Sequence, residues 1–252
     1  MKHLSILAGA LLLGLASTGL PTNSAQAQTN APDKAATKQM VREVLRENPE
    51  ILMEALDNLR KQMESGQASE SRNTLSGLRK ELERDPDTFV AGNPAGDVTI
   101  VEFFDYRCGY CKQAQPVIEQ LVKQDGRIRL ALKEFPILGP DSVVASRAAI
   151  AAMRQKKYAP FHDALMATQG ALSEARLLRI ASDAGLDAAR LRSDMDDPKI
   201  EKIIGRKHEI AESLGISGTP SFIIGDTLVP GVAELDKLQR LVAAARRECL
   251  TC

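Results

Sequence analysis

The sequence predicts an α/β domain that contains a helical insertion and follows a separate helical segment. The run VTIVEFF at residues 98–104 is β-branched, aromatic and mostly apolar, as expected for a strand buried on both faces. A helical pattern over 112–123 and the alternating run RIRLALKEF at 127–135 complete a βαβ unit. A helical region, two short strands and a last helix are expected after it, at residues 141–214, 221–224, 227–229 and 234–247.

Apolar residues three or four positions apart predict amphipathic helices ahead of this domain. The sequence Asn48-Pro49-Glu50 combines an N-cap residue, a proline suited to the first helical position and an acid for the first turn. One helix is therefore expected to end there and a second to begin, and a third helical stretch over 71–84 is expected to act as a linker. The apolar positions are Val41, Val44, Leu45, Leu52, Leu56, Leu59 and Met63.

These helices contain about 50 residues, which is too few to bury their own apolar stripe in a core. The stripe can pack on the following domain, or several copies of the chain can bury it against one another as helix bundles do. We favour self-association, although no heptad run is long enough to specify the number of chains. The predicted organisation is a helical oligomerisation segment with its linker at 38–85 and a folded domain at 86–252.

The first 27 residues have the pattern of a signal peptide. Lys2 and His3 precede an apolar run at 4–15, and Ala25-Gln26-Ala27 has the small-x-small pattern of a cleavage site. A membrane anchor is the alternative, but the apolar run of about 12 residues is shorter than the roughly 20 that a spanning helix needs. We therefore expect a signal peptide at 1–27, a flexible leader at 28–37, and export to the periplasm without stable membrane insertion.

The composition excludes nucleic acid as a favoured partner. The chain has 33 basic and 33 acidic side chains, so no cationic excess is available to displace counterions from a phosphate backbone. The hydrophobic share of 44% and the charged share of 26% argue against a wholly disordered chain. A folded protein is expected.

All four cysteines lie in Cys-x-x-Cys pairs, Cys108 with Cys111 and Cys249 with Cys252. A disulfide that closes so short a loop constrains little chain entropy, so such pairs suit redox chemistry or metal binding better than stapling a fold. Cys108 is expected at the N-terminus of a helix, where unpaired N–H groups and the helix dipole stabilise a thiolate. Cys111, one turn further on, is then the more buried, resolving thiol.

A metal site and an inert disulfide are the alternatives for the first pair. Zinc needs four ligands, and only His162, His208 and the distant second pair could complete the set. Their spacing matches no compact zinc ribbon or finger. We therefore expect neither a metal nor a cofactor, and we interpret both histidines as surface or core residues.

The sequence around the first pair carries a resemblance to a known family. Residues 101–112 read VEFFDYRCGYCK and residues 218–222 read GTPSF. Together they resemble the exported thiol:disulfide oxidoreductases of the DsbA family, over roughly residues 87–247. The resemblance implies a thioredoxin fold with an inserted helical domain, and a cis Pro220 that faces the cysteine pair so that the Thr219 backbone can bind an extended substrate.

Two further residues match the family pattern, as an acid and a lysine below the active site. Glu102 lies in the strand that leads to the motif, and Lys133 lies in the second strand. The resemblance implies that this pair relays the proton of the resolving thiol, a task that suits a buried carboxylate of raised pKa. A strand salt bridge with only a structural role is the alternative.

Within the family, the pair Gly109-Tyr110 and the threonine before Pro220 resemble disulfide isomerases of the DsbC type. The helical sequence NPEILMEAL at 48–56 resembles the ScsC group, which oligomerises through such a segment. The resemblance implies a periplasmic protein disulfide isomerase or reductase that acts on exported proteins with cysteines. A membrane thiol reductase would keep it reduced, and it would form a homo-oligomer through residues 38–85.

Two other functions remain open on the sequence. A monomeric dithiol oxidase of the DsbA type, recharged by a membrane oxidase, would need no helical segment. A non-enzymatic protein could instead hold copper(I) between the soft thiolates of the first pair. The C-terminal pair departs from the family pattern, and we interpret Cys249 and Cys252 as a local disulfide or exposed thiols, with a second redox relay or a metal-binding tail as alternatives.

Overall fold

The computed structural model describes residues 33–248, apart from the side chains of 63–71 and 248. The predicted signal peptide, the first part of the leader, Cys249 and Cys252 lie outside the described residues. The chain divides into two compact units, with the boundary between Leu59 and Arg60. We describe each unit by itself.

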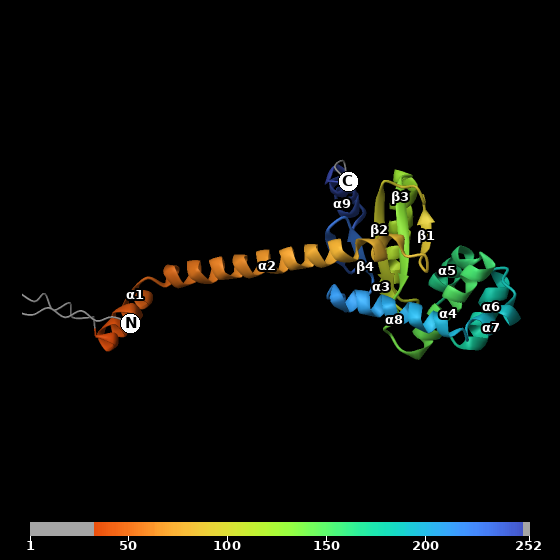
Figure 1. Cartoon of the computed structure of the whole chain (residues 1–252), viewed down its shortest axis with the longest axis horizontal. Coiled ribbons are helices and arrows are strands. Elements are labelled where there is room, and N and C mark those ends of the chain that lie inside the picture. Colours follow the sequence, from red (N-terminus) through yellow and green to blue (C-terminus); the bar gives the residue numbers. More distant parts are fainter. Residues whose placement is uncertain (1–32, 249–252) are drawn as a thin grey trace, which may run out of the picture. The chain divides into compact units, whose positions relative to one another are not determined.

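The order of elements matches the one that the sequence predicts, except for one further strand, β1, and for the joining of the second and third predicted helices into α2 (Figure 1). The first helices, α1 and α2, precede a sheet whose second half follows an all-helical insertion. The bounds are α1 Lys34–Glu47, α2 Pro49–Arg84, β1 Phe89–Gly92, β2 Val98–Phe104, α3 Gly109–Asp125, β3 Ile128–Glu134, α4 Pro140–Ala152, the 3-10 helix Met153–Gln155, α5 Tyr158–Ala167, α6 Glu174–Asp183, α7 Ala188–Asp194, α8 Pro198–Ser213, β4 Ser221–Ile224, β5 Thr227–Pro230 and α9 Leu235–Glu248.

The helix α1 begins at Lys34, within the stretch expected to be a flexible leader up to residue 37. The reason is a cap that the apolar pattern does not contain, because the carboxylate of Asp33 accepts a hydrogen bond from the N–H of Ala35 at 3.0 Å. At its other end α1 stops at Asn48, and α2 starts at Pro49. The predicted junction of two helices at this point is confirmed.

The helix α2 continues without a break to Arg84, where the sequence analysis expected a separate third helix from residue 71. No proline interrupts residues 50–84, and without one the helical hydrogen bonds continue. The last turns of α2 belong to the second unit. Leu75 and Leu82 are 3% and 2% exposed, because they pack on the sheet.

The sheet has five strands in the order β1-β3-β2-β4-β5. Strands β2 and β3 are parallel, while β1, β4 and β5 each run antiparallel to their neighbours. The edge strand β1 was not expected from the sequence. It pairs Phe89 with Leu132 of β3, and its turn-rich surroundings concealed it.

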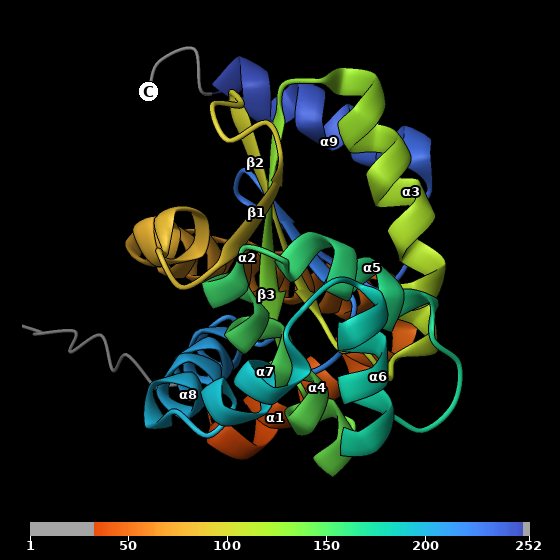
Figure 2. The same cartoon turned by 90° about the vertical axis from the view of Figure 1, so that its right-hand side faces the viewer.

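The central strand β2 is buried over its whole length, as the apolar run predicts. Helices α3 and α9 lie on one side of the sheet, while α8 and the end of α2 lie on the other (Figure 2). Alternate residues of β2 therefore enter two different cores. Ile100 and Phe104 belong to the core with α3, α9 and the insertion, whereas Val101 and Phe103 belong to the core with α2 and α8.

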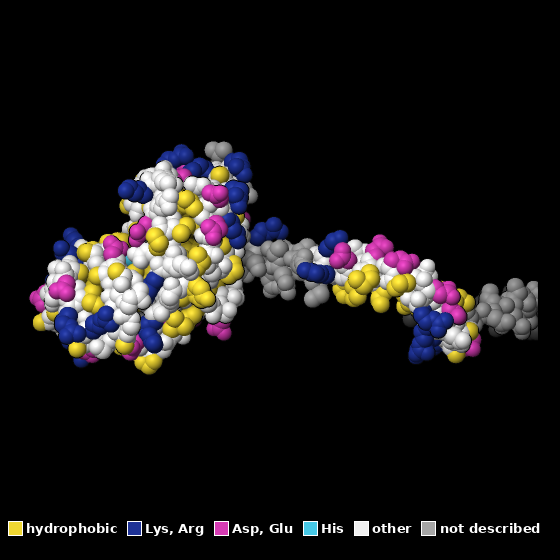
Figure 3. All heavy atoms as spheres, turned by 180° about the vertical axis from the view of Figure 1, so that it is seen from behind, with side chains coloured by type: hydrophobic (Ala, Val, Ile, Leu, Met, Phe, Trp, Pro, Cys, Tyr) yellow, Lys and Arg dark blue, Asp and Glu magenta, His cyan; other side chains and the backbone are white. Residues whose placement is uncertain are grey.

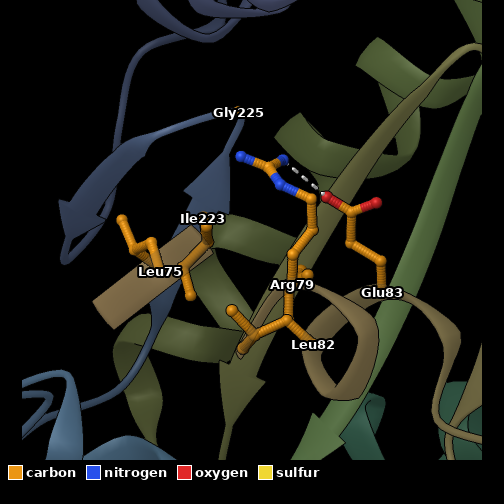
Figure 4. A pocket seen from close by; sticks show the side chains of 7 residues that line it. Leu75, Arg79, Leu82, Glu83, Ile223 and Gly225 are labelled. Carbon is orange, nitrogen blue, oxygen red and sulfur yellow. Dashed lines mark hydrogen bonds and ion pairs between the residues drawn. The ribbon is translucent and has the colours of Figure 1, made fainter. Parts of the chain in front are cut away.

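The end of α2 is held to the sheet by charge as well as by apolar contact. Figure 4 shows a small pocket at this junction, in which the Arg79 side chain lies near Leu75 and Leu82 and reaches Glu83. The Arg79 guanidinium donates to Glu83 at 3.1 Å and also pairs with Asp226 at the turn after β4. The folded domain therefore includes the last turns of α2 and begins earlier than the expected residue 86.

This junction predicts that the end of α2 stabilises the folded domain. We expect Leu82→Ala to lower its free energy of unfolding by about 2 to 5 kcal/mol, because a buried leucine is replaced by a cavity. Lys80→Ala on the exposed side of the same helix should change it by less than about 0.5 kcal/mol. Chemical denaturation of both variants measures the difference, and equal small effects would contradict the packing role of α2.

Candidate active site

The cysteine pair lies where β2 gives way to α3. Cys108 is the N-cap of α3, and its sulfur accepts a hydrogen bond from the N–H of Cys111 at 3.4 Å. Both thiols are free, and they are 5% and 0% exposed. The expected placement of Cys108 at a helix N-terminus is confirmed, and this position stabilises a negative charge on its sulfur.

The two thiols differ in their access to solvent and to charge. Burial raises the pKa of Cys111 far above its ordinary value of 9.0, and this effect outweighs the hydrogen bonds that act in the opposite direction. Cys111 therefore holds its proton at neutral pH. Before Cys111 can attack a mixed disulfide, another group must accept this proton.

The loop before β4 faces the pair. The Thr219–Pro220 peptide bond is cis, as the resemblance implied. The Cys108 thiol donates to the carbonyl oxygen of Thr219 at 3.2 Å. Strand β4 aligns Ser221 with Phe103 of β2, so the pairing of the two strands brings this loop to the cysteines.

Glu102 is buried on the side of β2 that faces α3, and it is 4% exposed. Burial first, and the nearby carboxylate of Glu119 second, raise its pKa to about 8. A carboxyl group with this pKa is mostly protonated at neutral pH and exchanges its proton readily. Its ionised fraction has the property expected of a proton acceptor for the Cys111 thiol.

Lys133 does not form the expected pair with Glu102. In the parallel register, Glu102 aligns with Leu132 and Phe103 aligns with Lys133. Side chains alternate between the two faces of a sheet, so the lysine lies on the face opposite to the glutamate. The expected acid and lysine below the active site are therefore not brought together.

The Lys133 ammonium instead binds the end of α2 and the turn after it. It donates to the carbonyl oxygen of Glu81 at 2.7 Å, to the carboxylate of Asp85 at 3.0 Å and to the hydroxyl of Thr88 at 2.9 Å. Its side chain is completely buried, and this burial lowers its pKa. The geometry favours the structural alternative for this residue.

A buried polar cluster behind the cysteine turn was not expected from the sequence. One oxygen of the Glu134 carboxylate accepts hydrogen bonds from Tyr106 at 3.0 Å and Tyr158 at 2.6 Å, and the other accepts from Ser146 at 2.7 Å. His162 lies 3.0 Å from the Tyr106 hydroxyl, which agrees with its interpretation as a core residue. Burial raises the pKa of Glu134 to about 7.

Asp105 is a second residue that the sequence analysis did not single out. Its carboxylate is completely buried and accepts four hydrogen bonds, from Arg107, Ser142 and the two backbone N–H groups of Ile137 and Leu138. The signal in the sequence that could have indicated it is the run Asp105-Tyr106-Arg107 directly before Cys108. The carboxylate thus joins the turn before Cys108 to the segment after β3.

Within residues 33–248, no group of three or more His, Cys, Asp or Glu side chains is placed to hold a metal ion. None of the helices described for this chain is both long enough and apolar enough to span a bilayer.

Comparison with protein-family models supports the resemblance seen in the motifs. Residues 99–243 match the DSBA-like thioredoxin domain. Residues 33–64 match the N-terminal domain of the copper resistance protein ScsC. The two matches lie in sequence order, the first over α1 and the start of α2 and the second over most of the α/β domain.

Solved structures with the same fold include three bacterial proteins. A thioredoxin-like oxidoreductase from Silicibacter pomeroyi is 47% identical and has a TM-score of 0.66, over 67% of this chain and 98% of that one. Proteus mirabilis ScsC in a transitional conformation is 28% identical with a TM-score of 0.65, over 86% and 100%. A periplasmic thioredoxin-like protein from Salmonella enterica serovar Typhimurium is 29% identical with a TM-score of 0.62, over 68% and 96%.

Curated relatives include much longer proteins. A Na(+)/H(+) antiporter NhaA from Salinispora tropica is 32% identical over 164 residues, which are 64% of this chain and 25% of the antiporter. The chain thus spans about a quarter of the length of the first curated relatives that it matches.

The pKa of Glu102 predicts a pH-dependent stability. Because the folded value of about 8 lies above the ordinary value of 4.5, the stability present at low pH is lost as the pH rises towards 8. Relative to Glu102→Gln, the wild-type free energy of unfolding should fall by about 1.4 kcal/mol per pH unit across this window. Chemical denaturation from pH 5 to 9 measures the slope.

The matched control for this prediction is Glu234→Gln, which neutralises an exposed carboxylate. It should keep the wild-type slope, since this side chain is exposed in the folded protein. A wild-type slope equal to that of Glu102→Gln would mean that Glu102 ionises as freely in the folded protein as in the unfolded chain.

Proposed function

The chain belongs to the family of the DSBA-like thioredoxin domain, and from this premise we propose that it is a protein disulfide isomerase or reductase. Its family is that of thiol:disulfide oxidoreductases related to DsbA and ScsC. The observation that carries the proposal is the contact of the Cys108 thiol with the Thr219 carbonyl, with Cys111 buried behind it. This contact supports exchange at Cys108 with a polypeptide disulfide.

The chemistry proposed for Cys108 is thiol–disulfide exchange. The Cys108 thiolate attacks one sulfur of a substrate disulfide, forms a mixed disulfide and releases the other substrate sulfur as a thiolate. In isomerisation a substrate thiolate then attacks the mixed disulfide and returns Cys108 as a thiolate, so no net oxidation occurs. In reduction the ionised form of Glu102 accepts the proton of Cys111, and the Cys111 thiolate attacks the Cys108 sulfur of the mixed disulfide. The second substrate sulfur leaves as a thiolate, so the products are a Cys108–Cys111 disulfide and a fully reduced substrate.

Exposed apolar side chains favour an unfolded polypeptide as the substrate. Among the described residues of the second unit, the exposed large hydrophobic side chains are Tyr110, Leu138 and Val232, at 68%, 43% and 39% exposed. Tyr110 lies between the cysteines, and Val232 follows Gly231, whose N–H binds the Pro220 carbonyl at 2.8 Å. Substrates are therefore exported proteins whose cysteines are flanked by exposed apolar residues.

The helical segment supports the isomerase assignment over a monomeric oxidase. Its apolar side chains are exposed in the first unit, from Leu45 at 37% to Met40 and Met53 at 66%. Figure 3 shows hydrophobic side chains along one edge of the first part of α2, with acidic side chains along the opposite edge. An apolar stripe exposed along a helix is unfavourable in water unless a partner covers it. We propose that the partner is a second copy of the same segment.

The protein acts in the periplasm, and a partner returns its cysteine pair to the reduced state. Export to the periplasm is supported by the signal-peptide pattern and by the similarity to a periplasmic thioredoxin-like protein. A reductase needs an external source of two electrons per turnover, and a membrane thiol reductase supplies them. The match to a copper resistance protein favours a second candidate function, in which Cys108 and Cys111 hold copper(I) as thiolates.

The assay that tests the function is reactivation of a disulfide-scrambled protein in a glutathione buffer. We expect catalytic reactivation by the mature chain and none by Cys108→Ser. Cys111→Ser should keep part of the isomerisation, because that path needs only Cys108, and should lose net reduction. Rapid oxidation of a reduced test protein without unscrambling would indicate the monomeric oxidase instead, and retention of stoichiometric copper(I) without either activity would indicate metal handling.

Self-association through the stripe has a separate test. Leu52→Glu with Leu56→Glu places two carboxylates on the apolar side of α2, so the protein should sediment as a monomer while the wild type sediments as an oligomer. Gln39→Glu introduces a carboxylate on the opposite side of α1 and should leave the assembly intact. A wild-type protein that sediments as a monomer at micromolar concentration would contradict self-association through the stripe.

A further inference from the structure

The turn that leads into Cys108 is fixed by Asp105. The Asp105 carbonyl oxygen accepts from the N–H of Cys108 at 3.0 Å, and its carboxylate accepts from the N–H of Arg107 at 2.7 Å. These two bonds set the path of the four residues between the end of β2 and the start of α3. The position of the reactive sulfur at the helix N-terminus depends on this turn.

The same carboxylate also holds the loop after β3. Its second oxygen accepts from the N–H groups of Ile137 and Leu138, at 2.8 Å and 3.0 Å, and its first oxygen also accepts from the Ser142 hydroxyl of α4 at 2.8 Å. The Arg107 guanidinium donates to the Leu138 carbonyl at 2.8 Å. Backbone groups of the loop are thus bound by residues that lie directly before Cys108.

The loop is also restricted by its own sequence. Pro136 and Pro140 fix the backbone at its two ends. Gly139 between them has φ +105°, a conformation that other residues rarely adopt. With its backbone held in this way, the loop presents the Leu138 side chain at 43% exposure, and a leucine held rigidly in water loses little entropy when an apolar group contacts it.

We propose that Asp105 is a positioning residue of the exchange site, which fixes the loop 136–140 against the Cys108 turn so that Leu138 contacts the polypeptide bonded to Cys108. The inference rests on the proposed function, since it concerns selection among disulfide substrates. The Asp105 carboxylate touches neither the substrate nor the Cys108 sulfur, and the Asp105 backbone forms a hydrogen bond with the Cys111 thiol. It acts through the two N–H groups of Ile137 and Leu138, and it makes the loop and the dithiol turn one rigid unit.

Asparagine at position 105 tests this role with little change of shape. One amide oxygen cannot accept all four of the hydrogen bonds that the carboxylate accepts, and the amide nitrogen cannot accept any. The reductase assay compares two disulfides, oxidised glutathione, which has no apolar side chain beside its cysteine, and a peptide disulfide with leucine beside the cysteine. For Asp105→Asn we expect kcat/KM for the peptide to fall about tenfold, mainly through KM, and for glutathione no more than about twofold.

A double-mutant cycle shows whether the effect passes through the loop. Leu138→Ala should lower kcat/KM for the peptide by a similar factor, and Asp105→Asn with Leu138→Ala together should lower it no further. Multiplying effects, or an equal loss with glutathione, would overturn the proposal, because Asp105 would then act on the dithiol or on the fold as a whole. Failure of the wild type to turn over either disulfide would overturn the proposed function instead.

Two further variants keep the test independent of folding. Arg107→Ala removes the guanidinium that binds the Leu138 carbonyl at the exposed side of the turn, so it should fold and show an intermediate loss for the peptide only. Asp187→Asn makes the same chemical change at the exposed cap of α7 and should leave both substrates unaffected. An unchanged peptide preference in Arg107→Ala would contradict the role of the loop.

Discussion

Burial of β2 on both of its faces is the constraint on which the rest of the structure depends. The strand passes between two cores, so its alternate side chains are committed to different sides. It orients Glu102 towards α3, ends at the turn that carries Asp105 and Cys108, and aligns Ser221 beside Phe103. A shift of β2 by one residue would exchange the two faces and move every group of the site together.

The parts of the site that the sequence could predict are those within continuous stretches of chain. The apolar run of β2, the Cys-x-x-Cys spacing and the following helix place Cys108 at an N-terminus by local geometry alone, and the fold that follows from the motifs is confirmed. Pro220 needed the resemblance, because nothing local shows which loop faces the cysteines.

The predictions that were wrong or missing concern residues whose positions depend on pairing between distant segments. Whether Lys133 shares a face with Glu102 is decided by the register of β2 and β3, which neither strand specifies by itself. The edge strand β1 and the end of α2 likewise gain their order from the sheet that they cover. The bonds of Asp105 to Ile137 and Leu138 join residues more than 30 positions apart, so only the fold reveals them.

The buried ammonium of Lys133 has a consequence for any transfer of the α/β domain to another protein. Its partners are the Glu81 carbonyl, Asp85 and Thr88, all of which lie upstream of β1. A graft of the α/β domain that starts at the first strand would carry the lysine without the groups that solvate it. The last turns of α2 and the turn that follows are therefore part of any transferable form of this domain, whatever helical segment is joined ahead of them.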